Sequence, residues 1–339
     1  WRVPANLIED AVLLKAEAWQ TWAESLRAAD KAAPAEALSG LLEWMPLASV
    51  HKLLFGFLDK RAEWWAWAAG RADPLADAVA EQQAVANLDE ARDVVAEMWS
   101  EPGFPAALAE FLPMLAANGA GVKQDAERAG VLADLLEQAR TESHWAGLQA
   151  IFLTAKSEPF VRKPGAALDK RLGAERAARF IELHYSLAER VLRALRQLQD
   201  QYALRLNRLA LTAGSDLLAH YQALKRERDG LDFTDAEWLA LQLLSDPDES
   251  AALLARLDAR WKHLLLDEFQ DANPLQWHIL TAWLSAYGAD PERPTVFMVG
   301  DPKQSIYRFR RAEPRLFELA GSWLTQNFAA AVYRQDETR

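Results

Sequence analysis

The sequence predicts a mostly helical protein that ends in a partial α/β region. Residues 1 to about 229 show helical periodicity with few interruptions, and beyond them two short apolar runs flank one helix. A strand, a helix and a second strand within about 35 residues are typical of a βαβ unit in a parallel sheet. We therefore expect two domains, a large helical one over 1–229 and a partial parallel-sheet one over 230–339.

Composition limits the classes of function. Of the 339 residues, 51% are apolar and 26% are charged, which is typical of a globular protein. The net charge of −11 argues against general polyanion binding, so any nucleic-acid contact needs a local basic surface. The absence of cysteine excludes disulfides, thiolate metal sites and a cysteine nucleophile, and it favours a cytoplasmic location. No run of about 18 apolar residues occurs, so we expect no membrane-spanning segment.

Helix signals are clear in the first part of the chain. Pro74 suits the first turn of a helix. Gly214 is interpreted as a break in a later long helix, and Gly230 as the stop of that helix. One apolar face of this helix is predicted by steps of three and four residues through Leu187, Val191, Leu195, Leu198 and Tyr202. Loops are predicted at 101–105, 117–121 and 157–165.

The helical part also contains residues with alternative interpretations. The tryptophan-rich segment 63–70 is either a stacking platform for bases or ordinary helix packing, and packing is favoured because large aromatics mostly fill cores. His184 and His220 are interpreted as ordinary helix residues. A further loop either touches DNA or is merely solvated, with solvation favoured, and its cations are Lys156, Arg162 and Lys163.

After residue 230 the elements become shorter. Thr234 and Glu237 have the spacing of a capping box, which would begin a new helix there. In a second helix, Asn273 suits the N-cap and Pro274 the first turn. Two continuous apolar runs are typical of strands that are buried on both faces, and they are HLLLDEF (263–269) and TVFMVGD (295–301).

Both predicted strands end in carboxylates. Asp267 and Glu268 follow the first strand, and Asp301 follows the second. In open parallel sheets, ligands bind beyond the carboxyl ends of the strands. There one carboxylate can bind Mg²⁺ while another orients or deprotonates a water, as phosphoryl transfer requires. The alternative for this segment alone is a strand that simply ends in solvent.

A basic stretch with interleaved aromatics follows the second strand. Tyr307 and Phe309 lie between the cations, and Glu313 is the one acid. Basic groups follow phosphates and aromatic faces stack on bases, so single-stranded nucleic acid is the predicted ligand. The alternative is a solvated basic loop with two core aromatics. The cations are Lys303, Arg308, Arg310, Arg311 and Arg315.

Together these segments resemble a known family. LLLDEFQD (264–271) and VGDPKQSIYRFRRAE (299–313) resemble the second and third motifs of UvrD/Rep-type superfamily 1 helicases, and GDPKQ is closer to the RecB/AddA branch. LDFTD (231–235) is similar to the segment by which this family returns from its helical insertion. The resemblance implies that 1–229 are the helical insertion of the first motor half. It also implies that 230–339 are part of a RecA-like, parallel-sheet P-loop NTPase motor domain.

The resemblance implies roles for the motif residues. Asp267 would hold the Mg²⁺ of MgATP, and Glu268 would be the base or the water-orienting group. Gln304 would sense the γ-phosphate and couple it to the DNA path. Gln270 would support the nucleotide site, and Asp271 would be structural, through hydrogen bonds to the next helix start. Bases of single-stranded DNA would stack on Tyr307 and Phe309, and the phosphate or coupling contacts would come from Arg308, Arg310 and Arg311.

The activity that the resemblance implies is that of an ATP-dependent DNA helicase or translocase. By the family's habit it would move 3′ to 5′ on single-stranded DNA, in recombination or repair of DNA ends, and it can be a subunit of a helicase–nuclease. The second hypothesis is a catalytically degenerate, helicase-like DNA-binding or structural subunit. The third is an acidic helical scaffold whose motif matches are accidental.

The sequence departs from the family pattern in several places. Many relatives have Trp where Phe309 stands and Gly where Arg311 stands, so base stacking and the loop can differ. LTQNF (324–328) is similar to a fourth motif, but Ala329 stands where arginine is needed. The alternative is that this motif begins at the closing ETR (337–339). No phosphate loop of the form GxxxxGK followed by Ser or Thr occurs. Because the chain starts at Trp1, not Met, we expect a piece of a longer protein. Because this piece has no phosphate loop, we expect that it does not hydrolyse ATP alone.

Overall fold

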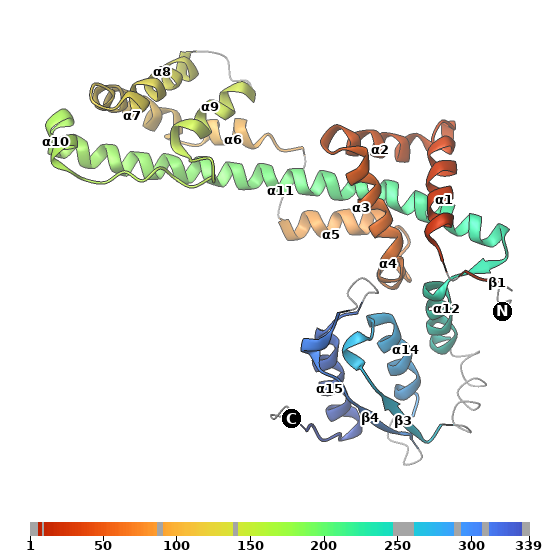
Figure 1. Cartoon of the computed structure of the whole chain (residues 1–339). Helices are drawn as coiled ribbons and strands as arrows, with labels where there is room; N and C mark the ends of the chain where they lie inside the picture. The colour runs from red at the N-terminus through yellow and green to blue at the C-terminus, as the bar shows by residue number, and fades with distance from the viewer. Residues whose placement is uncertain are drawn as a thin grey trace. The chain divides into compact units, whose positions relative to one another are not determined.

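The structure is a computed structural model of the chain, and its elements are labelled in Figure 1. It describes residues 6–8, 10–86, 91–137, 142–246, 261–287, 293–306 and 312–333. The chain forms two compact units, one from Trp1–Pro74 with Leu209–Arg339 and one from Leu75–Arg208. Helices dominate the described residues and short parallel strands accompany them, which confirms the predicted mostly α, partly α/β class. The predicted domain boundary near residue 230 stays a prediction.

The first unit begins with a set of helices. Its elements there are α1 (Val12–Ser25), the 3-10 turn η1 (Ala29–Lys31), α2 (Ala32–Trp44), α3 (Leu47–Asp59) and α4 (Arg61–Ala68). The last turns of α11 (Ala174–Glu227) belong to the same unit. Several large side chains of these helices have no exposed surface, including Trp22, Leu41, Leu54, Leu58, Leu217 and Tyr221.

Two glycines have roles other than those predicted. The helix α11 runs unbroken from Ala174 to Glu227, so the predicted break at Gly214 is wrong. A Cβ at Gly214 would lie 2.9 Å from the Phe57 ring, so glycine permits this close approach. Gly230 does not end the helix either. It belongs to strand β2 (Gly230–Leu231), which pairs in parallel with β1 (Asn6–Leu7).

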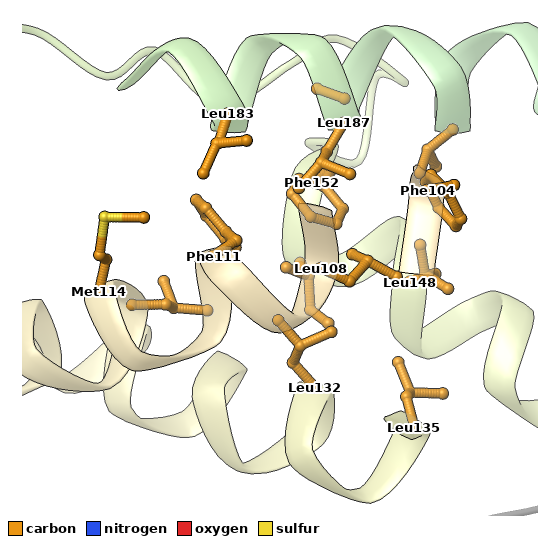
Figure 2. Close-up of a cluster of buried hydrophobic side chains, with 14 of the residues drawn as sticks. Phe104, Leu108, Phe111, Met114, Leu132, Leu135, Leu148, Phe152, Leu183 and Leu187 are labelled. Atoms are coloured by element: carbon orange, nitrogen blue, oxygen red, sulfur yellow. The ribbon is translucent and has the colours of Figure 1, made fainter. Parts of the chain in front are cut away.

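The second unit is helical. It contains α5 (Pro74–Ala86), which starts at the predicted proline, and then α6 (Val94–Ser100), α7 (Phe104–Gly119), α8 (Lys123–Glu137), α9 (Glu142–Phe152), α10 (Ala166–Leu172) and the first part of α11. Leucines and aromatics from α7, α8, α9 and α11 pack into one core (Figure 2). The predicted stripe is confirmed in part. Leu187 and Val191 are wholly buried in this core, but Tyr202 is exposed.

The Arg162 side chain forms an ion pair within the second unit. Its guanidinium donates to both oxygens of Asp125, over 2.7 and 2.9 Å, and lies over the Phe180 ring. Asp125 is 1% exposed and also accepts from Asn118 and Arg128. Burial raises the pKa of the Asp125 carboxyl, but these donors outweigh it and the net pKa is lowered. Arg162 therefore anchors the 157–165 loop, in place of the solvated or DNA-facing role considered for it.

His184 is not an ordinary helix residue, because it lies in the core of the second unit with no exposed surface. Its Nε2–H donates to the Phe160 carbonyl over 2.8 Å, and its buried Nδ1 has no partner among the described residues. Burial, helped by the charge of Arg162, lowers the pKa of His184 from 6.5 to about 4.

The buried imidazole predicts acid sensitivity. Above pH 6.5 both the folded and the unfolded state hold His184 neutral, whereas below it only the unfolded state gains the proton. Stability should therefore fall as the pH drops from 6.5 to about 4, by about 3 kcal/mol at 1.36 kcal/mol per pKa unit. Urea unfolding at several pH values measures this, and H184Q should flatten the dependence. H220Q, on the same helix, is the control and should keep it. An unchanged slope in H184Q would contradict the prediction.

The tryptophans of the 63–70 segment pack against neighbouring side chains. The rings of Trp64 and Trp67 stack at 5.4 Å, and the Arg71 guanidinium lies 3.9 Å from the Trp67 ring centre. Trp65 contacts Trp238 of α12 (Phe233–Ser245) at 5.7 Å. All three tryptophans of the segment are half-buried. These contacts agree with the packing interpretation.

The rest of the first unit contains the predicted βαβ unit. Strand β3 (His263–Leu266) is followed by the turn η2 (Phe269–Asp271), α14 (Pro274–Ser285), β4 (Thr295–Met298), the turn η3 (Pro302–Gln304) and α15 (Arg315–Phe328). Leu266, Val296 and Met298 pack against a core from η2, α14 and α15. The alternate residues are exposed, Leu265 by 73% and Phe297 by 63%. The prediction of strands buried on both faces is therefore wrong for the described residues, since α14 and α15 cover one face.

Capping signals were right for one helix and wrong for another. Asn273 caps α14 in a box with Gln276, and Pro274 is the first helical residue, as predicted. The box of α12 is formed by Asp232 and Asp235, so the predicted pair of Thr234 and Glu237 is wrong. Both pairs have the same spacing. The aspartates form the capping box because the Asp235 carboxylate also accepts hydrogen bonds from the buried cations Arg61 and Lys225. In the described part of the chain, no helix has the length and apolar composition needed to cross a membrane.

Candidate functional site

The two strand ends of the sheet lie side by side. Strands β3 and β4 are parallel, with Leu266 opposite Met298. Pairing continues past both strands, because the Val299 N–H donates to the Leu266 carbonyl over 2.8 Å and the Phe269 N–H donates to the Val299 carbonyl over 3.1 Å. The carboxylates that follow the two strands are therefore brought to one edge, as the sequence predicted.

Glu268 has a strained backbone. Its φ of 51° and ψ of 38° lie in the left-handed region, which residues with a Cβ rarely adopt. Such a conformation costs on the order of 1–3 kcal/mol and is found most often at functional sites. The Glu268 N–H donates to Asp267 Oδ1 over 2.9 Å, and both side chains are exposed. The turn therefore leaves two adjacent carboxylates accessible at the end of β3.

Gln270 connects the segment after β3 to the segment after β4. Its side chain is 1% exposed. The Nε2 group donates to the Glu268 carboxylate, and Oε1 accepts from the Asp301 N–H over 3.0 Å. The Gln270 carbonyl accepts from the Ser305 hydroxyl over 3.1 Å. A buried amide thus holds an exposed carboxylate and a loop backbone at the same time.

The Asp301 carboxylate binds Gln304, the residue predicted to sense the γ-phosphate. Its Oδ1 accepts from the Lys303 N–H and its Oδ2 accepts from Gln304 Nε2, each over 3.0 Å. These two bonds lower the pKa of the Asp301 carboxyl, the backbone N–H of Lys303 having the larger effect. Asp301 is therefore ionised at neutral pH and orients the exposed Gln304 side chain.

Sequence reasoning missed three contributors to this arrangement. They are Gly300, which approaches the Gln270 amide, Ser305, which binds the Gln270 carbonyl, and the Asp301 side chain as a cap of η3. For Asp301 a signal existed, since aspartate before Pro and Lys often bonds the backbone two residues on. For Gly300 and Ser305 the contacts depend on the pairing of β3 with β4.

Asp271 does not have the predicted bonding. The start of α14 is capped by Asn273 and Gln276 alone. In the described part of the chain, the buried Oδ1 of Asp271 has no hydrogen-bond partner. The expectation that Asp271 bonds to the next helix start is therefore wrong, because Asn273 already satisfies that N-terminus.

The donor set suits one kind of metal. Among the described residues, no three His, Cys, Asp or Glu side chains gather as a complete metal site. Mg²⁺ usually takes one or two carboxylates and completes its shell with water and nucleotide phosphates. The exposed carboxylate of Asp267 at the sheet edge fits that requirement, and dedicated all-protein ligation is not required.

The predicted DNA-binding residues Tyr307, Arg308, Phe309, Arg310 and Arg311 lie outside the described residues. The described residues on either side of them are attached to the segment after β3. The Ser305 hydroxyl binds the Gln270 carbonyl, and the Glu313 N–H donates to the Ala272 carbonyl over 3.2 Å. The described residues Ser305 and Glu313 are thus both bonded to the segment that follows β3.

Comparison with known families identifies the class of the protein. A model of the UvrD/REP helicase N-terminal domain matches residues 115–322, which is more than half of the chain. The chain belongs to this family, and the resemblance of its two motifs is confirmed.

Curated relatives give a narrower likeness. A stretch of the chain is similar to an AddA-type ATP-dependent helicase/nuclease subunit of Desulfitobacterium hafniense, with 44% identity over 97 residues. The protein of the same description is 44% identical over 102 residues in Clostridium perfringens and 48% identical over 98 residues in Lactiplantibacillus plantarum. These alignments cover 29% of this chain and only 7 to 8% of the relatives.

Proposed function

We propose that the protein containing this chain is an ATP-dependent DNA helicase or translocase. The observation that carries the proposal is the set of carboxylates at one sheet edge, with Glu268 and Gln304 joined through Gln270 and Asp301. Family membership and the names of the relatives support the same activity. The alternative, a strand that simply ends in solvent, does not explain why a buried amide links the two motifs.

The proposed roles follow the chemistry of each group. Asp267 holds Mg²⁺ bound to ATP, and Glu268 orients or deprotonates the attacking water. Gln304 responds to the γ-phosphate, and Asp301 keeps its amide oriented until then. Residues 230–339 form part of a RecA-like motor domain, and 1–229 form its helical insertion. The exposed positions of Asp267, Glu268 and Gln304 support this assignment, since a nucleotide must reach them.

The proposed nucleic-acid ligand is single-stranded DNA. Bases stack on Tyr307 and Phe309, and phosphates meet the arginines beside them, namely Arg308, Arg310 and Arg311. We further propose 3′ to 5′ movement, a role in recombination or repair of DNA ends, and assembly with a partner protein. The description of the relatives as helicase/nuclease subunits supports the partner.

An ATPase assay on the complete gene product tests this proposal. Hydrolysis should be stimulated by single-stranded DNA, whereas the chain alone, which has no GxxxxGK phosphate loop, should hydrolyse no ATP. A complete protein with neither a phosphate loop nor DNA-stimulated hydrolysis would instead be a degenerate DNA-binding or structural subunit.

Removing one stacking ring should weaken coupling to DNA. Base–aromatic stacking contributes about 1–3 kcal/mol per base, so Y307A or F309A should raise the DNA concentration for half-maximal ATPase by about 5- to 150-fold. Titration with an oligothymidylate measures this change. Y333A is the matched control, because Tyr333 is 92% exposed and far along the sequence from the motif. Equal DNA dependence in all three variants would contradict the stacking role.

A further inference from the structure

Gln270 is placed to act on the reaction without contacting the nucleotide. Both ends of its buried amide are used inside the protein, Nε2 by the Glu268 carboxylate and Oε1 by the Asp301 N–H. The partners determine this orientation, because a carboxylate only accepts and a backbone N–H only donates. A nucleotide contact would require breaking one of these bonds. The nucleotide-supporting role that the family resemblance implies for Gln270 is therefore better explained as indirect.

The packing around Gly300 supports a tight connection. A Cβ built on Gly300 would lie 2.3 Å from Gln270 Oε1 and 3.1 Å from the Phe269 nitrogen. The backbone after β4 therefore rests directly on the amide, with no room for a side chain between them. When the loop with Asp301 shifts, the amide must shift with it, because it is bonded at its oxygen and packed on its side.

We propose that Gln270 is a positioning residue that orients the Glu268 carboxylate and ties its position to the loop holding Gln304. The inference rests on the proposed function and deepens it. The connection runs from Gln304 to the Asp301 carboxylate, through the Asp301 backbone to the Gln270 amide, and on to Glu268. Movement of Gln304 toward a phosphate therefore reaches the hydrolytic carboxylate through a buried hydrogen-bonded path.

The chemistry of an amide suits this task. Glutamine donates to Glu268 without adding a charge, so it sets the direction of the carboxylate without forming an ion pair with it. Asparagine is one methylene shorter and cannot span both partners. A carboxylic acid of glutamine's length can replace the amide only when protonated, because only then does it donate to Glu268 and still accept from Asp301. When ionised it repels Glu268 and donates nothing.

The test uses Q270E and Q270N in the complete gene product, with ATPase measured at saturating single-stranded DNA. Both variants should lower kcat by about 10- to 100-fold at pH 8, as expected when the partner that orients a functional group is lost. The KM for ATP should change little, since Gln270 does not bind the nucleotide. In Q270E the kcat relative to wild type should rise as the pH falls from 8 to 6, whereas in Q270N it should stay low.

Gln276 offers a matched control. Its amide is bonded in the same way, donating to Glu237 over 2.8 Å and accepting from the Asn273 N–H over 3.2 Å, but at the start of α14. Q276E and Q276N should keep wild-type kcat and pH profile. Thermal unfolding of all four variants separates loss of fold from loss of turnover, and Q270N supplies the kcat comparison where Q270E does not fold.

The outcomes separate this inference from the proposed function. An inactive wild-type protein would refute the proposed function itself. An E268Q variant with normal turnover would instead refute the role of Glu268, and the positioning role of Gln270 with it. An active wild type with E268Q inactive and the Gln270 variants unchanged in kcat would overturn only the positioning role. The same holds if the Gln276 variants lose as much kcat as the Gln270 variants. A raised KM with normal kcat would make Gln270 a nucleotide ligand and also overturn the inference.

Discussion

Replacing Glu268 with glutamine in the complete protein is expected to abolish ATP hydrolysis while ATP binding stays nearly intact. The substitution keeps the shape of the side chain and the left-handed backbone at this position, but it removes the group that orients or deprotonates water. Loss of a positioned base commonly costs about 10²- to 10⁴-fold in rate. The exposure of Glu268 at the sheet edge means that no buried charge is lost, so the fold should survive.

The measurement is steady-state ATPase with single-stranded DNA, together with calorimetric titration of a non-hydrolysable ATP analogue. E237Q is the control. Glu237 also accepts hydrogen bonds from side-chain amides, those of Asn273 and Gln276, but it belongs to α12 and binds the start of α14, not the residues that follow the strands. Its variant should turn over ATP at the wild-type rate. Normal turnover in E268Q would remove Glu268 from the mechanism, because hydrolysis would then proceed without its carboxylate.

Replacing Lys225 with methionine should destabilise the first unit by about 3–5 kcal/mol, the usual cost of leaving a buried charge without its partner. Lys225 is 1% exposed and donates to Asp235 and Asp232, and Arg61, 2% exposed, pairs with the same two aspartates. The Tyr221 hydroxyl donates to Asp232 over 3.2 Å. Two cations and two anions balance, so removing one cation leaves a buried negative charge.

Urea unfolding of the chain itself measures this effect. K123M is the matched control, because Lys123 pairs with Glu127 on the surface at 92% and 65% exposure, and its loss should change stability by less than about 0.5 kcal/mol. The double variant K225M/D235N restores charge balance, so its loss should be smaller than the sum of the single losses by about 1–3 kcal/mol. Strictly additive losses, or a K225M as stable as K123M, would contradict the balanced-cluster interpretation.

The cluster should also depend on pH in a defined direction. Burial raises the pKa of the Asp235 carboxyl, but Arg61 and Lys225 outweigh it and the net pKa is lowered below 3.8. A carboxyl with a lowered folded-state pKa stabilises the fold above its ordinary pKa, and this contribution is lost as the pH falls through the folded value. The stability difference between wild type and D235N should therefore persist down to about pH 4 and shrink below it.

Local patterns in the sequence determined much of the site. The apolar runs before Asp267 and Asp301 predicted two parallel strands, and parallel pairing alone puts their ends at one edge. The N-cap role of Asn273 likewise depends on residues that are neighbours in the chain. Such features can be predicted from the sequence because they depend on contacts between residues close in the chain, or on the direction in which two strands pair.

Other features were decided only by the tertiary structure. Glycine often interrupts a helix, but Gly214 lies within one. Its missing side chain leaves room for the Phe57 ring of another helix. Arg162 lies in a loop whose basic residues suggest a solvated surface. Its guanidinium nevertheless forms an ion pair with the buried Asp125, 37 positions earlier in the chain. The choice of Asp232 and Asp235 over an equally spaced pair depends on Arg61. In each case the deciding partner is remote in sequence, and only chain folding determines how much water the group loses and which charge replaces it.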